Sequence, residues 1–393
     1  MLAVSASGAH SPNSDSTVDY YDKLGVTKII NAAGTYTALT ASIMPPSVRA
    51  AVAHAAQHPV RLAELQKASG EYLAKNLRCE AALVTAGAAS GLTLATAACI
   101  TRGDRSAIEK IPNDLSGLKN EVIVQKAHRY DYDHAILNCG IHFVEVETLA
   151  DYEKAFSEKT AMAHFFNAAE HGSISREDWI RVAHSHQVPC LNDAAADVPP
   201  ISNLWNYTQM GFDLVTFSGG KGMRGPQNAG LLLGRKNLID AALANDMPIS
   251  ATIGRGMKVS KEQIVGMVAA VDWFLGQTDE DMRAEFTARA NRIAERLKDI
   301  PGLQARIAIP PVANRVPHLV LTYDQSKVKI SPIALAQALR KGNPAIELNP
   351  ATGHRNAQGI TGDEDAIVVG VWMLQPGEDL IVARRLYKAL TDY

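Results

Sequence analysis

The chain has 393 residues, a formal net charge of −2, 47% hydrophobic residues and 20% charged residues. This balance is typical of a globular protein with a substantial core, and the length suggests two domains. The near-neutral charge and the absence of long runs of one sign argue against a nucleic-acid partner, which requires clustered lysine and arginine side chains.

The first residues, 1–17, are rich in Ser, Ala and Gly. They lack the basic and apolar regions of a signal peptide, so we predict a disordered leader. No uncharged apolar run is long enough to span a bilayer, which predicts no membrane partner. Four cysteines are scattered without metal-ligand spacing, a pattern that suits a reducing cytoplasm. We predict no metal site, and we interpret the polar run 131–134 as a helix start.

Residues 28–36 predict a short strand entering a turn, and the apolar spacing from Pro45 to about Asn76 is helical. Strands and helices then alternate. The predicted strands are Ala81–Thr85, Glu121–Gln125, His142–Glu147, Ala161–Phe166, Val188–Asn192 and Leu214–Ser218, with helices at Gly91–Ile100 and Trp179–His186. This alternation implies crossover connections, and therefore an α/β fold with a mostly parallel central sheet and helices on both faces.

The pattern changes after Met247. The predicted helices are Lys261–Leu275, Asp281–Lys298, Pro332–Arg340 and Glu378–Leu390, and the predicted strands are Leu319–Thr322 and Ile367–Val371. We therefore predict a leader and arm at 1–45, a large domain at 46–255, and a smaller C-terminal α+β domain at 256–393.

The most informative segment is Phe212–Gly222, in which an apolar strand runs into Ser-Gly-Gly-Lys. A lysine that forms imines must lose its charge near neutral pH, through burial or a cationic neighbour. Glycines beside Lys221 let a bulky ring approach the backbone, and Ser218 is placed to bind a phosphate. The same residues also fit an ordinary surface turn with a solvated lysine.

A second strand, ending at Asp193, is followed by Ala-Ala-Ala. A pyridine cofactor acts as an electron sink only while its ring nitrogen stays protonated, and a buried aspartate holds that proton. Asp193 fits this role, with Asp197 as a rival in the same turn. Asp193 also fits the cap of a helix.

The segment Val84–Leu92 is a third strand, followed by small residues and then a helix. Such a turn offers free backbone N–H groups and the positive end of a helix to an anion. It matches neither GxxxxGK[ST] nor GxGxxG, so a small phosphorylated cofactor fits it better than a nucleotide. His128 follows another strand and could stack on a pyridine ring, or lie in a polar surface loop. All four pieces lie at predicted strand ends, where open α/β sheets bind ligands.

Read in order, these segments resemble the fold-type I enzymes that use pyridoxal 5′-phosphate (PLP). More narrowly, the chain resembles the selenocysteine synthase-like branch, the relatives of L-seryl-tRNA selenium transferase. The resemblance rests on residues 30–34, 215–221 with 225–227, and 374–378. Residues 256–262 are most similar to members of the D-glucosaminate-6-phosphate ammonia-lyase type.

The resemblance implies PLP as the cofactor, bound as a Schiff base by Lys221, with Asp193 at the ring nitrogen and His128 above the ring. It implies phosphate contacts from Gly87, Ala88, Ala89, Ser90 and Ser218. A homodimer or larger assembly is also implied. Arg255 is a candidate for a substrate carboxylate or phosphate, with Arg224 and Arg315 as competitors.

The expected reaction acts at Cα and Cβ of an amino acid or amino-sugar acid, a small-molecule substrate. In α,β-elimination, Lys221 removes the Cα proton, a group leaves Cβ, and ammonia and a 2-keto product are released. Racemisation or epimerisation starts from the same carbanion and is an alternative, with His128, Tyr130 or His171 as the second acid. A tRNA-linked seryl selenium transferase is a third reading, disfavoured by the charge and the short leader.

Overall fold

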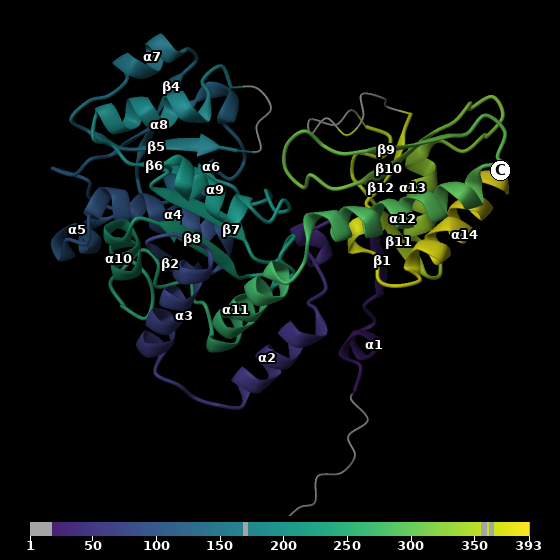
Figure 1. Ribbon diagram of the computed structural model, residues 1–393, viewed down its shortest axis with the longest axis horizontal. Coiled ribbons are helices and arrows are strands. Elements are labelled where there is room, and N and C mark those ends of the chain that lie inside the picture. Colours follow the sequence, from purple (N-terminus) through teal and green to yellow (C-terminus); the bar gives the residue numbers. More distant parts are fainter. Residues whose placement is uncertain (1–17, 168–171, 355–359, 361–364, 393) are drawn as a thin grey trace, which may run out of the picture.

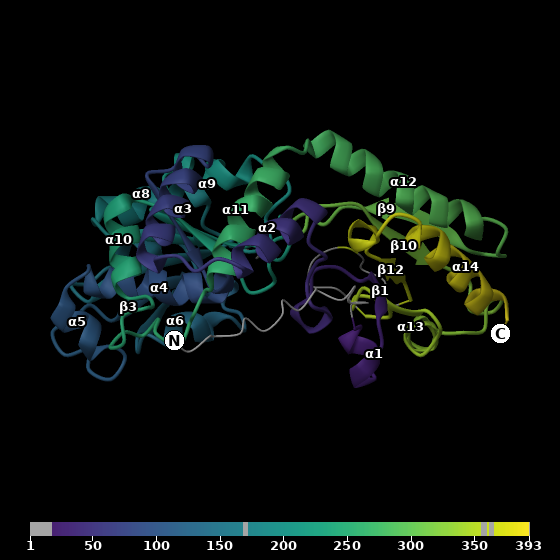
Figure 2. The same ribbon diagram turned by 90° about the horizontal axis from the view of Figure 1, so that it is seen from below.

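The computed structural model describes residues 18–167, 172–354, 360 and 365–392. Figure 1 shows two lobes joined by a long helix, and Figure 2 shows the same lobes from below. Buried side chains form two main apolar clusters around the larger sheet and another in the second lobe. No helix in these parts of the chain combines the length and apolar character needed to cross a membrane.

The larger lobe is built on a seven-stranded sheet with the order β2-β8-β7-β6-β5-β3-β4. Its strands are β2 (Ala81–Thr85), β3 (Glu121–Gln125), β4 (His142–Val146), β5 (Thr160–Phe166), β6 (Cys190–Asp193), β7 (Leu214–Ser218) and β8 (Gly230–Gly234). The sheet is parallel from β4 to β7, and β8 runs antiparallel to both of its neighbours. The predicted α/β fold with a mostly parallel sheet is confirmed.

Both faces of this sheet are buried, because alternate residues of each strand point to opposite faces. On β7, Leu214 belongs to one apolar cluster, whereas Val215 and Phe217 belong to the other. The helices of this lobe are α2 (Pro46–Ala56), α3 (Leu62–Asn76), α4 (Gly87–Thr101), α5 (Arg105–Lys110), α6 (Asp133–Leu137), α7 (Leu149–Lys154), α8 (Arg176–Ser185), α9 (Asn203–Met210), α10 (Lys236–Ala244) and α11 (Lys261–Leu275), with short 3-10 turns η1 (Thr37–Leu39) and η2 (Lys126–His128).

The second lobe contains a three-stranded antiparallel sheet, β12-β10-β9, and a parallel pair, β1-β11. Its elements are β1 (Ile29–Ala32), α12 (Asp279–Leu297), β9 (Gln304–Ala308), β10 (His318–Thr322), α13 (Pro332–Arg340), β11 (Ala345–Leu348), β12 (Ile367–Val369), η3 (Val371–Met373) and α14 (Glu378–Thr391). The short helix α1 (Tyr20–Leu24) precedes β1 and buries no residue.

The core clusters refine the division of the chain. Buried residues of α11 pack with the larger sheet, and those of β1 pack with the second lobe. We therefore propose that the second core begins at α12 and includes β1, a modification of the limits 1–45, 46–255 and 256–393.

Hydrogen bonds join the second lobe and its connecting arm to the segments that carry the predicted site. The hydroxyl of Ser42 donates to the Gly220 carbonyl over 2.7 Å, and Arg224 donates to the Trp372 carbonyl over 2.6 Å. The Asn314 N–H donates to the Ala196 carbonyl over 2.7 Å. The turns after β6 and β7 are therefore fixed from both lobes.

Candidate active site

The predicted site residues gather at one edge of the large sheet. β2, β6 and β7 point the same way, so Thr85, Asp193 and Ser218 lie at their carboxyl ends. Antiparallel β8 places Gly230 between Thr85 and Ser218. The Ser218 N–H donates to the Ala195 carbonyl over 3.2 Å, which joins the two turns that follow β6 and β7. This is the edge at which open α/β sheets bind ligands.

Lys221 lies in the turn after β7 and is half-buried. Burial lowers its pKa, because the charged ammonium loses hydration, while the negative charges of Asp193 and Asp197 oppose this shift. The glycines before it are required by close packing. A Cβ on Gly219 would lie 2.2 Å from the Met267 sulfur, and one on Gly220 would lie 2.8 Å from the backbone of Gln227.

Asp193 ends β6 and is 3% exposed. One carboxylate oxygen accepts the Ala195 N–H over 3.0 Å, and the other accepts the hydroxyl of Tyr130. Burial raises the pKa of Asp193, and these two donors together with Lys221 lower it. The carboxylate is thus held by two donors and retains unused acceptor capacity.

Asp197 lies in the same turn and is also buried. Its carboxylate accepts from Asn167 over 2.6 Å, and the amide of Asn167 also reaches the hydroxyl of Tyr207. Arg176 donates to the amide oxygen of Asn167. Burial raises the pKa of Asp197 to about 6. Asp197 therefore belongs to a polar network beside Asp193. The negative charges of both carboxylates favour the protonated form of Lys221.

The turn 87–90 opens the 15-residue helix α4. Gly87 has a φ of 85°, and the helix has no side-chain N-cap. The hydroxyl of Ser90 is buried and has no hydrogen-bond partner in the described part of the chain. A Cβ on Gly230 would lie 2.8 Å from the Ala88 nitrogen, so β8 approaches this turn closely. An uncapped helix with an unpartnered hydroxyl in its first turn is suited to an anion.

His128 is 1% exposed. Its Nδ1 accepts the Phe166 N–H over 3.2 Å, and its ring packs edge-on against Phe165. Burial, assisted by Arg176, lowers its pKa to about 4, so its ring is neutral at pH 7. The predicted stacking of His128 on a cofactor stays a prediction.

Tyr130 is the aromatic residue that contacts Asp193 directly. Its ring stacks on Phe166, with 3.8 Å between the ring centroids, and its hydroxyl donates to Asp193. The sequence predicted Tyr130 only as a possible second acid. His171, which was also predicted as a possible second acid, lies outside the described residues.

The three candidate arginines occupy different environments. The guanidinium of Arg224 donates to the Trp372 carbonyl and lies over the ring of Trp273, so it joins the lobes. Arg315 is exposed and follows Asn314, which contacts Ala196. Arg255 is half-buried in a segment that packs on α4 through Gly254. Of the three, Arg315 follows a residue that contacts the turn after β6.

The sequence model of the L-seryl-tRNA selenium transferase (SelA) family matches residues 29–317. A D-glucosaminate-6-phosphate ammonia lyase of Salmonella typhimurium is 31% identical over 343 residues, covering 84% of this chain and 89% of that protein. A 5′-C-glycyluridine monooxygenase-decarboxylase of a Streptomyces species is 29% identical over 387 residues, covering 95% and 92%. An L-seryl-tRNA(Sec) selenium transferase of Aquifex aeolicus is 26% identical over 232 residues, half of this chain.

Solved structures agree with this relationship. A structure of D-glucosaminate-6-phosphate ammonia-lyase superposes with a TM-score of 0.82 at 29% identity, covering 96% of this chain and 99% of that chain. The cysteine desulfurase CsdA of Escherichia coli superposes with a TM-score of 0.54 at 14% identity, a likeness of fold alone. The family match covers most of the chain, and the relatives extend across both lobes. The chain therefore belongs to the L-seryl-tRNA selenium transferase (SelA) family.

Proposed function

We propose that the chain is a PLP-dependent lyase that acts at Cα and Cβ of a small amino acid or amino-sugar acid, releasing ammonia and a 2-keto product. The observation that carries the proposal is a half-buried lysine whose pKa is lowered by burial, within electrostatic reach of two buried carboxylates. The ammonia-lyase relative, similar over 84% of the chain, supports an enzyme of this type.

The residues present fit PLP. The phosphate would be held by the uncapped start of α4 and the unpartnered hydroxyl of Ser90, with Ser218 close by. The ring nitrogen would be held by the remaining acceptor capacity of Asp193, and the aldehyde by Lys221. When bound, PLP supplies a protonated ring that delocalises the negative charge developing at Cα.

Lys221 takes the Cα proton, because a buried amine with a lowered pKa is neutral, and therefore basic, in a larger fraction of molecules near pH 7. Asp193 must be anionic to hold the ring proton, and the Tyr130 hydroxyl and Ala195 N–H favour that form. We propose that Arg315 binds the substrate carboxylate, because the neighbouring Asn314 N–H donates to the Ala196 carbonyl in the turn after β6.

Racemisation or epimerisation would require a second acid facing Lys221. Tyr130 is a described candidate, but its hydroxyl already donates to Asp193 and its pKa is raised by burial and by that carboxylate. Elimination is therefore favoured. The Streptomyces relative, similar over 95% of the chain, makes oxidative decarboxylation the second function to test.

We also propose a homodimer or larger assembly. Three residues of α1 with large apolar side chains are exposed: Tyr20 by 63%, Tyr21 by 59% and Leu24 by 72%. Such an arm favours contact with another copy. Light scattering on the purified protein tests this, and a monomeric mass at micromolar concentration would contradict it.

The cofactor is tested by the visible absorption spectrum of the purified protein reconstituted with PLP. We expect a visible band in the wild type that is lost in Lys221→Ala and kept in Lys67→Ala, a matched control whose side chain is 77% exposed on α3. A wild type that forms no such band with saturating PLP would contradict the role of Lys221.

The reaction is tested next by offering amino-sugar acids and amino acids to the loaded protein while measuring ammonia, oxygen, carbon dioxide and the optical activity of the substrate. Ammonia release without oxygen consumption supports the lyase. Oxygen-dependent loss of carbon dioxide would favour the decarboxylase instead, and racemisation without ammonia would favour the racemase.

A further inference from the structure

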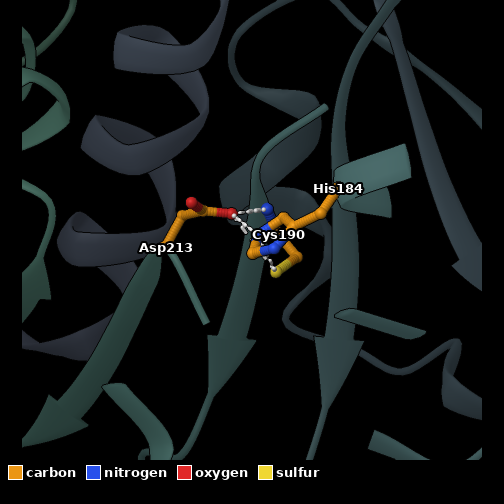
Figure 3. Close-up of side chains that lie close together, drawn as sticks. All are labelled: His184, Cys190 and Asp213. Atoms are coloured by element: carbon orange, nitrogen blue, oxygen red, sulfur yellow. Dashed lines mark hydrogen bonds and ion pairs between the residues drawn. The ribbon is translucent and has the colours of Figure 1, made fainter. Parts of the chain in front are cut away.

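A second cluster of polar side chains lies at the opposite edge of the same sheet, at the amino ends of β6 and β7. Its members are His184 from the last turn of α8, Cys190 as the first residue of β6, and Asp213 directly before β7. Figure 3 shows the three side chains pointing toward one another. The proposed lyase chemistry uses none of them.

The three side chains present one nitrogen, one sulfur and one oxygen. The His184 Nε2 lies 2.9 Å from the Asp213 Oδ2, the Cys190 Sγ lies 3.3 Å from the same oxygen, and the sulfur and nitrogen are 3.9 Å apart. A triangle with these sides has a centre roughly 2 Å from each corner. Zinc bonds to imidazole nitrogen, carboxylate oxygen and thiolate sulfur are about 2.0–2.3 Å long, so one ion reaches all three atoms with little movement.

The hydrogen bonding at Asp213 also favours a cation. Oδ2 accepts the thiol S–H and the backbone N–H of Cys190, and the His184 Nε2 lies beside it, so the thiol proton and a proton on Nε2 converge on one oxygen. A divalent cation replaces both protons, and the carboxylate and thiolate then balance its charge. Cys190 is fully buried and Asp213 is 2% exposed, which shields these ligands from water.

The surroundings supply support and access. Arg235 donates to the other oxygen of Asp213 over 2.9 Å, which fixes the orientation of the carboxylate as outer-shell donors do in metal sites. His184 and Asp213 line a pocket of about 570 Å³ that Arg102 and Arg235 also line. A fourth ligand, such as water, can enter from this pocket.

We propose that His184, Cys190 and Asp213 form a binding site for a zinc-like divalent cation, with one coordination position open to the pocket. The site is independent of the proposed lyase function, because it lies at the opposite edge of the sheet. No sequence motif indicated it, since its members are separated by 6 and 23 residues and are brought together by the pairing of β6 with β7.

The test uses the PLP-loaded enzyme after treatment with a chelator. Calorimetric titration with Zn²⁺ should give one ion per chain for the wild type. His184→Gln should weaken binding by roughly 100-fold or more, because loss of an outer-shell partner alone costs 10–100-fold. The matched control is His186→Gln, an exposed histidine two residues away, which should bind as the wild type does.

Titration with Co²⁺ identifies the ligands. The wild type should show visible bands of tetrahedral cobalt together with a thiolate charge-transfer band in difference spectra, and Cys190→Ser should lose the latter. No Zn²⁺ binding by the wild type, or equal binding by His184→Gln, would overturn the proposal. His184→Gln decides the matter even where Cys190→Ser fails to fold, because His184 is partly exposed. The PLP band at Lys221 should not change in any of these variants, so either proposal can fail alone.

Discussion

The neighbouring strands β6 and β7 carry a buried aspartate at each edge of the sheet, and the two carboxylates are treated very differently. Asp213, before β7, accepts from Arg235, from His184, and from both the N–H and the thiol of Cys190. Asp193, at the end of β6, accepts from Tyr130 and from the Ala195 N–H, and its negative charge raises the pKa of Lys221.

This difference separates a carboxylate that accepts many donors within the fold from one that accepts few. Asp213 accepts four donors, so its removal would leave several of them without a partner. Asp193 accepts two donors and keeps capacity for more, and its pKa is raised by burial. Buried carboxylates with perturbed pKa values and unused acceptor positions are concentrated at functional sites.

The largest effect is expected for Asp193→Asn. Turnover should fall roughly 10³-fold, an effect of the size that positioned acid–base groups contribute. The free energy of unfolding of the apoenzyme, unlike turnover, should increase relative to the wild type. A carboxylate with a raised pKa loses its contribution to stability as pH rises through that pKa, so the neutral variant should gain relative to wild type as pH increases.

Steady-state kinetics and urea unfolding at several pH values measure these two changes. If Asp193→Asn keeps wild-type turnover, the proposed role of Asp193 in the reaction is wrong.

Asp213→Asn should show the reverse pattern. The variant leaves the buried Cys190 N–H and its partly exposed partners His184 and Arg235 without a carboxylate, so we expect a loss of about 2–3 kcal/mol in the free energy of unfolding. The PLP band should persist in the folded enzyme. The control is Asp240→Asn, whose side chain is 59% exposed on α10. Equal stability of the two variants in urea would contradict the structural role of Asp213.

The smallest effect is expected for Tyr130→Phe, which removes one donor from Asp193. The pKa of Asp193 should rise, because the Tyr130 hydroxyl favours the ionised carboxylate. As the pH is lowered, the variant should therefore begin to lose PLP affinity at a higher pH than the wild type does. The difference should be about one pH unit, because a hydrogen bond to a charged group contributes about 1.5 kcal/mol.

PLP titrations from pH 5 to 8, roughly the range over which proteins are most stable, measure this shift. Tyr132→Phe, 57% exposed, is the control and should follow the wild type. Identical pH profiles for Tyr130→Phe and wild type would show that the hydroxyl has no influence on Asp193.

Much of the fold could be predicted because local pattern and tertiary environment agree. The bounds of β2, β3 and β7 match the predicted strands, as those of α11 and α13 match the predicted helices. Their apolar runs are bounded by glycine, proline or polar residues that act as start and stop signals. The helix predicted over 45–76 is interrupted at residues 57–61, where Pro59 removes a backbone donor.

Other elements carry too little local signal. β8 is a run of three leucines between glycines, and it is defined by its antiparallel partners β2 and β7. β9 is largely exposed, so it has no strong alternation.

The same reasoning applies to the site. Lys221, Asp193 and the turn 87–90 follow predicted strands, so strand ends alone could bring them together. The contact between Tyr130 and Asp193 joins residues 63 positions apart, and it depends on where the ring of Tyr130 packs on Phe166. The His184–Cys190–Asp213 cluster depends in the same way on the pairing of two strands. Side-chain packing of this kind leaves no periodic trace in a sequence.

The bond between Arg224 and the Trp372 carbonyl has a mechanical meaning. Arg224 is three residues beyond Lys221, and it holds the loop of that lysine to the second lobe. The position of the backbone beside Lys221 is therefore coupled to the position of the second lobe. Together with the bond from Ser42 to the Gly220 carbonyl, the Arg224 bond makes the turn that carries Lys221 a part of both halves of the molecule.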